Sequence, residues 1–277
     1  MVAKLLACGG CDLLSQSLLY AQAITPALNT GSGTLDIGGM SDLLIQWTCR
    51  TIDTFIRNDD SDENNCQDKF ASQYVCESIA LFLIEKQLSH LSAAYLLRVV
   101  GSLARYHAVN KKKLGDLGIC ECIPRLHQTY FQAESEYESD SFAFFTEAIC
   151  WSIANLAYPD ESNQDKLGAV DACDIVMDAL GVHRDQPIVV QEGLRALRNL
   201  AFSHDANLEL FYSWGERNRS EDKGVQSVCA VLMQIEERYR SNCGVLQWVW
   251  CTVAGAFVCL LIALAVTHSL KFISLCM

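Results

Sequence analysis

The sequence has 277 residues, of which 51% are hydrophobic and 19% charged, so the chain can bury a large core and does not have a disordered composition. A formal net charge of -12 disfavours nucleic acid as a partner, because affinity for a phosphate backbone rests on Lys and Arg. With only 4 prolines, and few stretches in which apolar and polar residues alternate, the sequence predicts an all-α fold.

The 14 cysteines are spread along the whole chain and mostly lie in apolar stretches. That distribution favours reduced, buried thiols over the disulfide framework of a small secreted domain. Two close pairs, Cys8 with Cys11 and Cys120 with Cys122, resemble halves of a zinc site. Neither is followed by a second pair at zinc-site spacing, so we expect no metal.

A short signature recurs along the chain. In four places a cysteine precedes an acidic residue and a lysine stands seven residues earlier; the cysteines are Cys11, Cys76, Cys120 and Cys173. A second pattern places an asparagine four residues before an apolar side chain, at Asn110, Asn163 and Asn207. The apolar positions Phe70, Leu114, Leu167 and Phe211 are separated by 44, 53 and 44 residues. A period near 44 indicates a repeat of two or three helices.

Each repeat is expected to contain a short first helix, a second helix that carries the cysteine, and a longer third helix. In one unit these helices are predicted at about 163–168, 170–181 and 188–202. Asn163 and Asn207 are predicted as N-caps of the short helix, and the cysteine is expected to pack inward. The units are predicted at about 1–57, 58–106, 107–158, 159–203 and 204–240, with loops at 24–41 and 133–141.

The stretch 148–176, AICWSIANLAYPDESNQDKLGAVDACDIV, resembles the armadillo-repeat family, and the resemblance extends over roughly residues 41–240. It implies a right-handed superhelical solenoid of about four to five units. It also matches Trp151 and Asn155 to the Trp and Asn pairs with which nuclear-import adaptors of this family hold extended peptides on their concave face. The first unit begins in its middle, so either an N-terminal stretch is missing or the array is capped by its own partial unit and another chain.

Neighbouring units depart from that pair. The positions equivalent to Trp151 are Arg98 and Arg195, and those equivalent to Asn155 are Ser102 and Asn199. Three interpretations of Trp151 stay open: packing between adjacent third helices, contact with some partner on the concave face, or membership of a receptor for nuclear-localisation signals. The residues predicted to bind a protein or extended peptide are Arg98, Ser102, Trp151, Asn155, Arg195 and Asn199.

The C-terminal part contains 23 uncharged residues, 245–267, which are long enough for a transmembrane helix. Residues 241–244 are expected to form a linker and 268–277 a short tail. Arg238 and Arg240 precede the span, which places the repeat domain in the cytosol and makes the protein single-pass and tail-anchored. The alternatives are an apolar last helix of the solenoid, and a cleaved signal ending near Ala23, which would make Asn218 a glycosylation acceptor.

No phosphate-binding loop, zinc-protease motif or nucleophile elbow occurs in the sequence, and the six histidines show no paired spacing. His183 and His204 are expected at the surface, and the acidic clusters at 59–63 and 134–140 in solvated loops. We therefore expect no enzyme activity, no cofactor and no small-molecule substrate. The leading hypothesis is a scaffold that recruits a partner protein to a membrane. The alternative is a soluble armadillo adaptor or regulator, such as a transport adaptor or a small-GTPase regulator.

Overall fold

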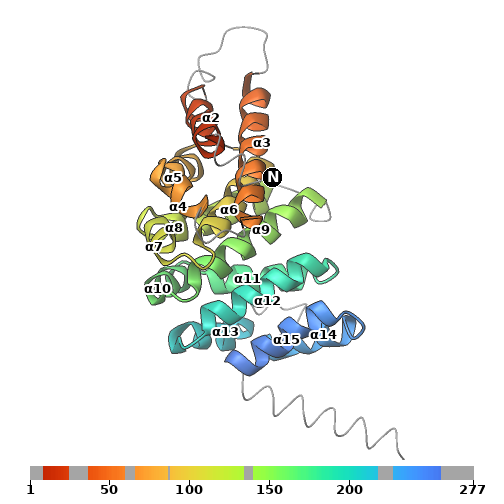
Figure 1. Ribbon diagram of the computed structural model, residues 1–277. Coiled ribbons are helices and arrows are strands. Elements are labelled where there is room, and N and C mark those ends of the chain that lie inside the picture. Colours follow the sequence, from red (N-terminus) through yellow and green to blue (C-terminus); the bar gives the residue numbers. More distant parts are fainter. Residues whose placement is uncertain are drawn as a thin grey trace, which may run out of the picture.

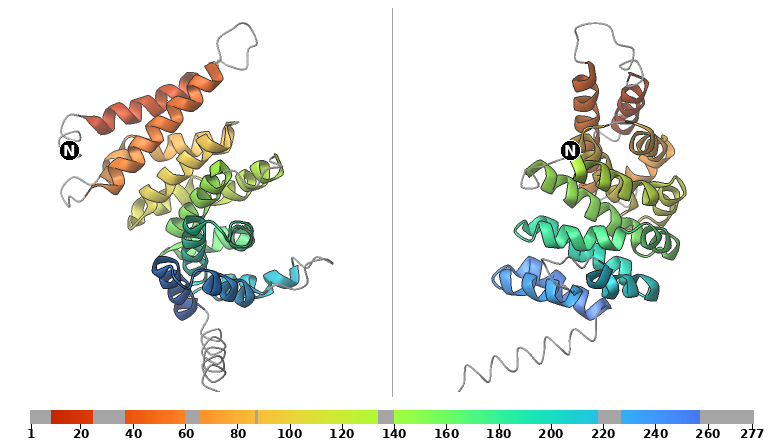
Figure 2. Two further views of the ribbon diagram at one scale, coloured as in Figure 1. Left: turned by 90° about the vertical axis from the view of Figure 1, so that its right-hand side faces the viewer. Right: turned by 180° about the vertical axis from the view of Figure 1, so that it is seen from behind.

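The computed structural model describes residues 9–24, 37–59, 66–86, 88–133, 140–217 and 227–256. Within these ranges the chain forms fourteen helices and no strand, which confirms the all-α prediction (Figure 1). The helices stack in chain order from α2 and α3 at one end to α14 and α15 at the other, so that consecutive groups of helices lie side by side (Figure 2). The architecture is a helical repeat array.

Each complete unit contains three helices, as predicted. The first helices are α4 (Cys66–Ser72), α7 (Ala108–Asp116), α10 (Glu161–Ala169) and α13 (Asp205–Arg217). The second helices are α2 (Gly10–Ile24), α5 (Val75–Glu85), α8 (Ile119–Ala133), α11 (Ala172–Val182) and α14 (Val228–Arg238). The third helices are α3 (Ile37–Arg57), α6 (His90–Ala104), α9 (Asp140–Ala157), α12 (Pro187–Ala201) and α15 (Cys243–Ala256). The three helices predicted at 163–202 are found as α10, α11 and α12, each within two residues of its expected ends.

The core is built from the residues that define the repeat. The apolar positions Phe70, Leu114, Leu167 and Phe211 on the four first helices are fully buried. The signature cysteines Cys11, Cys76, Cys120 and Cys173 are also buried, as expected of small apolar side chains near the start of each second helix. One continuous hydrophobic core therefore runs through the described part of the array.

The charged part of the signature joins successive units. Lys113 Nζ lies 2.8 Å from Glu77 Oε1, the acidic residue that follows Cys76 in the preceding unit. In the last described first helix, where Leu210 takes the place of the lysine, Arg217 pairs with Asp174, which follows Cys173. Lys166 Nζ donates to the carbonyl oxygen of Gly115 at 3.0 Å. The basic residue of one unit thus reaches back to the unit before it.

The asparagines also join units, and their predicted role as N-caps was wrong. The side chain of Asp160 caps α10 by accepting the backbone N–H of Asn163 at 2.9 Å, and His204 Nδ1 accepts that of Asn207 at 3.2 Å. The asparagines therefore stand inside the first turn of the short helix, where they are almost fully buried. Asn163 Nδ2 donates to two carbonyl oxygens of the preceding unit, both at 3.2 Å. One is Leu156 O, at the end of the third helix, and the other is Lys111 O, in the first helix.

The same bridge occurs in two other units. Asn110 Nδ2 donates to Gln67 O and Leu103 O at 3.2 and 3.3 Å. Asn207 Nδ2 donates to Gln164 O and Leu200 O, both at 3.1 Å. Each asparagine amide therefore satisfies two carbonyl groups of the preceding unit, which explains why the residue recurs.

The two histidines that we expected at the surface are buried, so that prediction was wrong. His204 is held by its role as the cap of α13 and by a 3.0 Å contact between Nε2 and Asp165 Oδ1. His183 contacts Thr146 Oγ1 at 3.2 Å, and its ring lies 5.5 Å from that of Phe142. Burial lowers the pKa of His183, so the neutral form is favoured there.

The apolar C-terminal segment begins inside the array. Helix α15 starts at Cys243, within the stretch expected to be a linker, and Val245 and Val249 are fully buried. In sequence order α15 follows the first and second helices of the fifth unit, and it packs on α12 as α12 packs on α9 (Figure 1). The start of the predicted membrane span is therefore corrected, because residues 245–252 belong to a third helix, and Val245, Val249 and Thr252 on one of its faces are covered by protein.

A hydrogen bond confirms the register of this helix. Thr252 Oγ1 donates to Leu194 O at 3.1 Å, as Ser152 Oγ donates to Leu97 O at 2.6 Å between α9 and α6. Among the residues that the structure describes, no helix is both long and apolar enough to cross a lipid bilayer. Residues 257–277, which include the second half of the predicted span, lie outside the described ranges. Apart from Asp59 and Asp140, the acidic clusters also lie outside them, as do residues 25–36 and 134–139 of the predicted loops. The predicted loops were too long, because residues 37–41 belong to α3 and residues 140–141 to α9.

Lys111 gives the fold a testable pH dependence. In two other units a glutamine at this position, Gln67 or Gln164, donates its amide to carbonyls at the end of the third helix. Lys111 Nζ instead donates to Tyr158 O, and the side chain is almost fully buried. Burial lowers the pKa of Lys111 to about 8, while Asp160 acts in the opposite direction.

We expect Lys111→Gln to raise the free energy of unfolding at pH 7 by about 1 kcal/mol. The unfolded lysine holds its proton up to a higher pH than the folded one, so the native protein gains stability as the pH rises from about 8 to about 10.5. The variant should lack this gain. Urea unfolding followed by circular dichroism at pH 7 and pH 10 measures it, with the exposed neighbour Lys112→Gln as control. Equal pH dependence in both variants would contradict the assignment.

Candidate functional site

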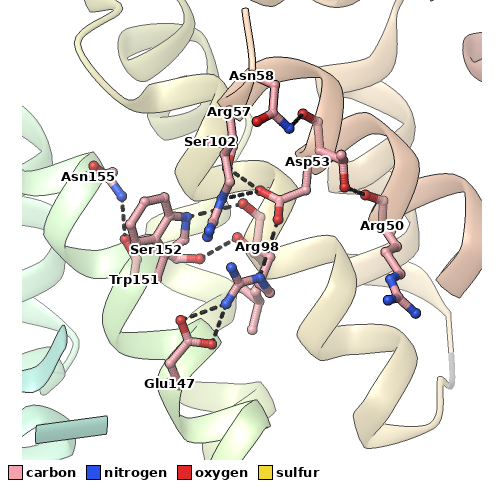
Figure 3. A network of polar contacts seen from close by, with 12 residues as sticks. Arg50, Asp53, Arg57, Asn58, Arg98, Ser102, Glu147, Trp151, Ser152 and Asn155 are labelled. Carbon is pink, nitrogen blue, oxygen red and sulfur yellow. Dashed lines mark hydrogen bonds and ion pairs between the residues drawn. The ribbon is translucent and has the colours of Figure 1, made fainter. Parts of the chain in front are cut away.

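The six residues predicted to bind a partner form one stripe along the third helices, which we call the polar stripe. Arg98 and Ser102 lie on α6, Trp151 and Asn155 on α9, and Arg195 and Asn199 on α12. Each pair stands at the same distance from the end of its helix. Neighbouring pairs are in contact: Trp151 donates to the backbone of Arg98 (Figure 3), and Arg195 donates to Asn155. The sequence alignment of the units was therefore sufficient to bring these residues together.

Arg98 is the centre of a buried ionic network. Its Nη1 atom lies 2.6 Å from Glu147 Oε1 and its Nε atom 3.4 Å from Asp53 Oδ2, while Ser102 Oγ donates to Asp53 Oδ1 (Figure 3). Burial opposes the charged form of Arg98, but the two carboxylates outweigh it and raise the pKa of the guanidinium. The network connects α3, α6 and α9, and so three successive units.

Trp151 packs between adjacent third helices. Its indole Nε1 donates to Arg98 O at 3.2 Å, and only 5% of the residue is exposed. The indole lies directly over Gly101 on α6, where an added Cβ would overlap it. Trp151 is therefore an interhelical contact, the first of the three interpretations that the sequence left open.

The asparagines of the stripe are bonded within the protein. Asn155 Nδ2 donates to Trp151 O at 2.8 Å, and its Oδ1 atom accepts from Arg195 at 2.5 Å. Asn199 Nδ2 donates to Ala154 O at 2.7 Å. Because both residues are buried and each amide nitrogen already bonds to a backbone carbonyl of the protein, they do not form the open ladder with which an import adaptor holds a peptide backbone.

Four guanidinium groups surround the Trp151 ring, and we call them the arginine cluster: Arg57, Arg98, Arg105 and Arg195. Their Cζ atoms lie between 4.5 and 6.0 Å from the ring centroid. The side chain of Arg195 is further fixed by Glu192 Oε2 at 2.9 Å from its Nη1 atom. Sequence reasoning missed Arg57 and Arg105, although both stand close to the end of a third helix.

An open groove of about 500 Å³ lies beside the polar stripe. Residues of α3, α6, α9 and the start of α12 line it, among them Arg50, Tyr95, Phe144 and Ile188. Ile188 is 56% exposed, and Arg98 and Glu147 also face the groove. No sequence pattern predicted this groove, because its residues come from four units and occupy different positions of the repeat.

Comparison with known proteins gives a weak but consistent result. No family model matches the sequence. Human and Macaca fascicularis ataxin-10 are each 25% identical over 124 residues, which is 45% of this chain and 24% of ataxin-10. Xenopus tropicalis ataxin-10 is 29% identical over 86 residues, 31% of this chain and 17% of the relative. The matched part is thus about a quarter of the length of the first two relatives.

The fold has a counterpart among solved structures. The crystal structure of an engineered protein superposes with a TM-score of 0.63 at 12% sequence identity, covering 92% of this chain and 82% of that one. An identity this low concerns the fold alone. Taken with the fourteen described helices and the bonds that join successive units, these comparisons indicate a helical repeat protein with distant similarity to ataxin-10.

Proposed function

We propose that this protein is a non-catalytic scaffold that binds a partner protein across its third helices. The observation that carries the proposal is the open groove beside the polar stripe, which crosses α3, α6, α9 and α12. An open surface that combines exposed apolar side chains such as Ile188 with charged ones such as Arg50 suits a polypeptide. The net charge of -12 supports protein rather than nucleic acid as the ligand.

The polar stripe has a supporting part in this proposal. Its side chains bond to one another and hold the third helices in register, so a partner would contact the exposed rim and the groove rather than the buried amides. Variants of Trp151 or Asn155 would change the fold and the surface together. Tests of binding should therefore use exposed residues.

The sharpest test combines Arg50→Glu with Ile188→Asp, which change the charge and the apolar character of the groove at two solvent-facing positions. Partners identified by proximity labelling would be purified and titrated against the wild-type chain by calorimetry. We expect at least one direct partner to lose roughly tenfold or more in affinity, about 1.4 kcal/mol. The matched control is Val109→Asp, an exposed apolar residue on the first helix α7. Unchanged binding of every direct partner would refute the groove as the docking site.

We further propose that the apolar C-terminal segment attaches the scaffold to a membrane, with the repeat domain facing the cytosol. The support comes from the sequence: the 30 residues 241–270 include no Asp, Glu, Lys or Arg. The last residue of α15 with a described contact to α12 is Thr252, so a span that leaves this packing intact can begin at residue 253, and 253–270 gives 18 residues without Asp, Glu, Lys or Arg. The competing proposal is a soluble adaptor or regulator of the armadillo kind.

Carbonate extraction separates these two proposals. The full chain should stay in the membrane pellet, whereas a variant ending at residue 256 should be released while keeping the whole described array. A deletion that began at residue 245 would remove most of α15 and confuse loss of anchoring with damage to the fifth unit. Release of the full chain into the supernatant would support the soluble alternative.

A further inference from the structure

The arginine cluster is a local concentration of positive charge in an acidic protein. The chain has a net charge of -12, yet the Cζ atoms of Arg195, Arg57, Arg105 and Arg98 lie 4.5, 4.6, 5.7 and 6.0 Å from the Trp151 ring centroid. The arginines come from three different units and the ring from a fourth. The negative face of an aromatic ring attracts such cations, and Trp151 therefore helps to hold them close together.

The carboxylates around this cluster are fewer than the cations. Asp53 pairs with Arg57 at 3.0 Å and also with Arg98, which is shared with Glu147. Glu192 pairs with Arg195 at 2.9 Å. Four arginines therefore face three acids in the part of the chain that the structure describes.

Arg105 carries the excess charge. Its guanidinium contacts two aromatic rings, those of Trp151 and Tyr106, and no described carboxylate lies within ion-pair distance of it. Arg105 is exposed, Arg57 beside it is 35% exposed along its side chain, and Tyr106 is 88% exposed. The two outer arginines of the cluster are therefore accessible to a ligand.

The excess of positive charge also affects Arg195, the inner arginine of the cluster. Burial lowers the pKa of Arg195, Glu192 opposes this effect, and the positive charges of Arg105 and Arg57 lower the pKa further. An added anion at the outer edge would relieve this repulsion.

Resting on the proposed scaffold function, we propose that the arginine cluster binds an acidic segment of the partner protein, with its carboxylates paired to Arg57 and Arg105. Guanidinium groups form strong, bidentate hydrogen bonds with carboxylates, and these two are already positioned by the Trp151 ring. A short acidic segment fits this site better than a long polyanion, because the excess charge is local while the rest of the chain is acidic. Apolar residues of the same segment would reach the groove that Arg98 borders.

A peptide selection tests this chemistry and requires no identified partner. A random library of twelve-residue peptides would be selected by mRNA display on the full chain, and on the variant Arg57→Gln with Arg105→Gln. We expect the wild-type chain to enrich Asp and Glu over the starting library and the variant to lose that enrichment. Both substitutions affect exposed side chains, so the fold should be retained, which circular dichroism would verify.

Affinities of the enriched peptides give the quantitative result. Fluorescence anisotropy should show roughly tenfold weaker binding to the double variant, and a smaller difference at high salt. The matched control, Arg238→Gln with Arg240→Gln, removes the same charge from the end of α14 and should bind like wild type. Enrichment of neutral or basic peptides, an equal loss in the control, or no enrichment at all would overturn the proposal.

The groove variant separates this proposal from the scaffold function. If neutral or basic peptides are enriched and lose binding on Ile188→Asp, the scaffold proposal stands and the acidic chemistry fails. If acidic peptides bind and depend on Arg57 and Arg105 but not on Ile188, the arginine cluster is the docking site and the groove assignment fails.

Discussion

Replacing Arg98 with methionine is expected to lower the free energy of unfolding by about 3 kcal/mol. The side chains of Arg98 and Glu147 are only 13% and 4% exposed, so the substitution leaves a carboxylate buried without its cation. Asp53 would keep Ser102 and Arg57 as partners but lose the guanidinium that ties α3 to α6 and α9. Since three units meet at this residue, no other single ion pair in the described ranges should matter as much.

Urea unfolding monitored by circular dichroism measures this effect. The double variant Arg98→Met with Glu147→Gln should recover part of the loss, because the buried charge is then gone. Arg240→Met is the control: Arg240 pairs with Glu237 at 3.5 Å on an exposed surface and should change stability little. If Arg98→Met proved as mild as Arg240→Met, Glu147 would have to be solvated in the native protein.

Gly101→Ala is expected to have a similar cost, about 3 kcal/mol, for a steric reason. The added Cβ would overlap the Trp151 indole, which is fixed by its bond to Arg98 O. Neither the ring nor the α6 backbone can move without separating two third helices. The helical preference of alanine over glycine, about 1 kcal/mol, works in the opposite direction and is too small to compensate.

Gly181→Ala is the matched control for this substitution. Gly181 also lies within a helix, α11, but a Cβ there would meet nothing within 4 Å. We expect it to raise the melting temperature slightly and Gly101→Ala to lower it by several degrees. Combining Gly101→Ala with Trp151→Leu should recover part of the loss, and failure of this rescue would argue against the indole as the cause.

The sequence predicted the repeat well because its signals are local and recur. The positions of Phe70, Leu114, Leu167 and Phe211, together with the cysteines, fixed the register of the helices, and all of these side chains are buried. Alignment of the units by this register also brought Arg98, Trp151 and Arg195 to equivalent positions. These predictions need only the spacing of a few recurring residues, namely the cysteines, the asparagines and the apolar positions.

The bonding of these residues could not be predicted in the same way. An asparagine at the start of a helix is a common N-cap, and the sequence does not reveal that Asp160 and His204 take that role and leave Asn163 and Asn207 to bridge units. The excess of arginine around Trp151 likewise depends on three-dimensional proximity across four units. Such contacts are set by how the units stack, and one unit alone does not contain that information.

At the C-terminal helix, the pattern of a membrane span overlaps with the pattern of a third helix of the repeat. The uncharged run that begins after Arg240 satisfies the length rule for a membrane helix, yet its first part is also the third helix that the fifth unit requires. Thr252 repeats the hydrogen bond that Ser152 makes in its own unit, but this equivalence depends on folded contacts and was not a signal in the sequence. Composition alone favoured the membrane interpretation for the whole run.

The asparagine bridges also determine how the array should come apart. Each asparagine amide belongs to the first helix of one unit and donates to two carbonyl groups of the preceding unit. A unit that opens therefore leaves those two carbonyl groups without their donor. Opening of one unit should therefore promote opening of the next, and the free energy of each interface adds to that of each unit. Slow amide exchange should accordingly be shared by blocks of adjacent units, with faster exchange near the two ends of the array.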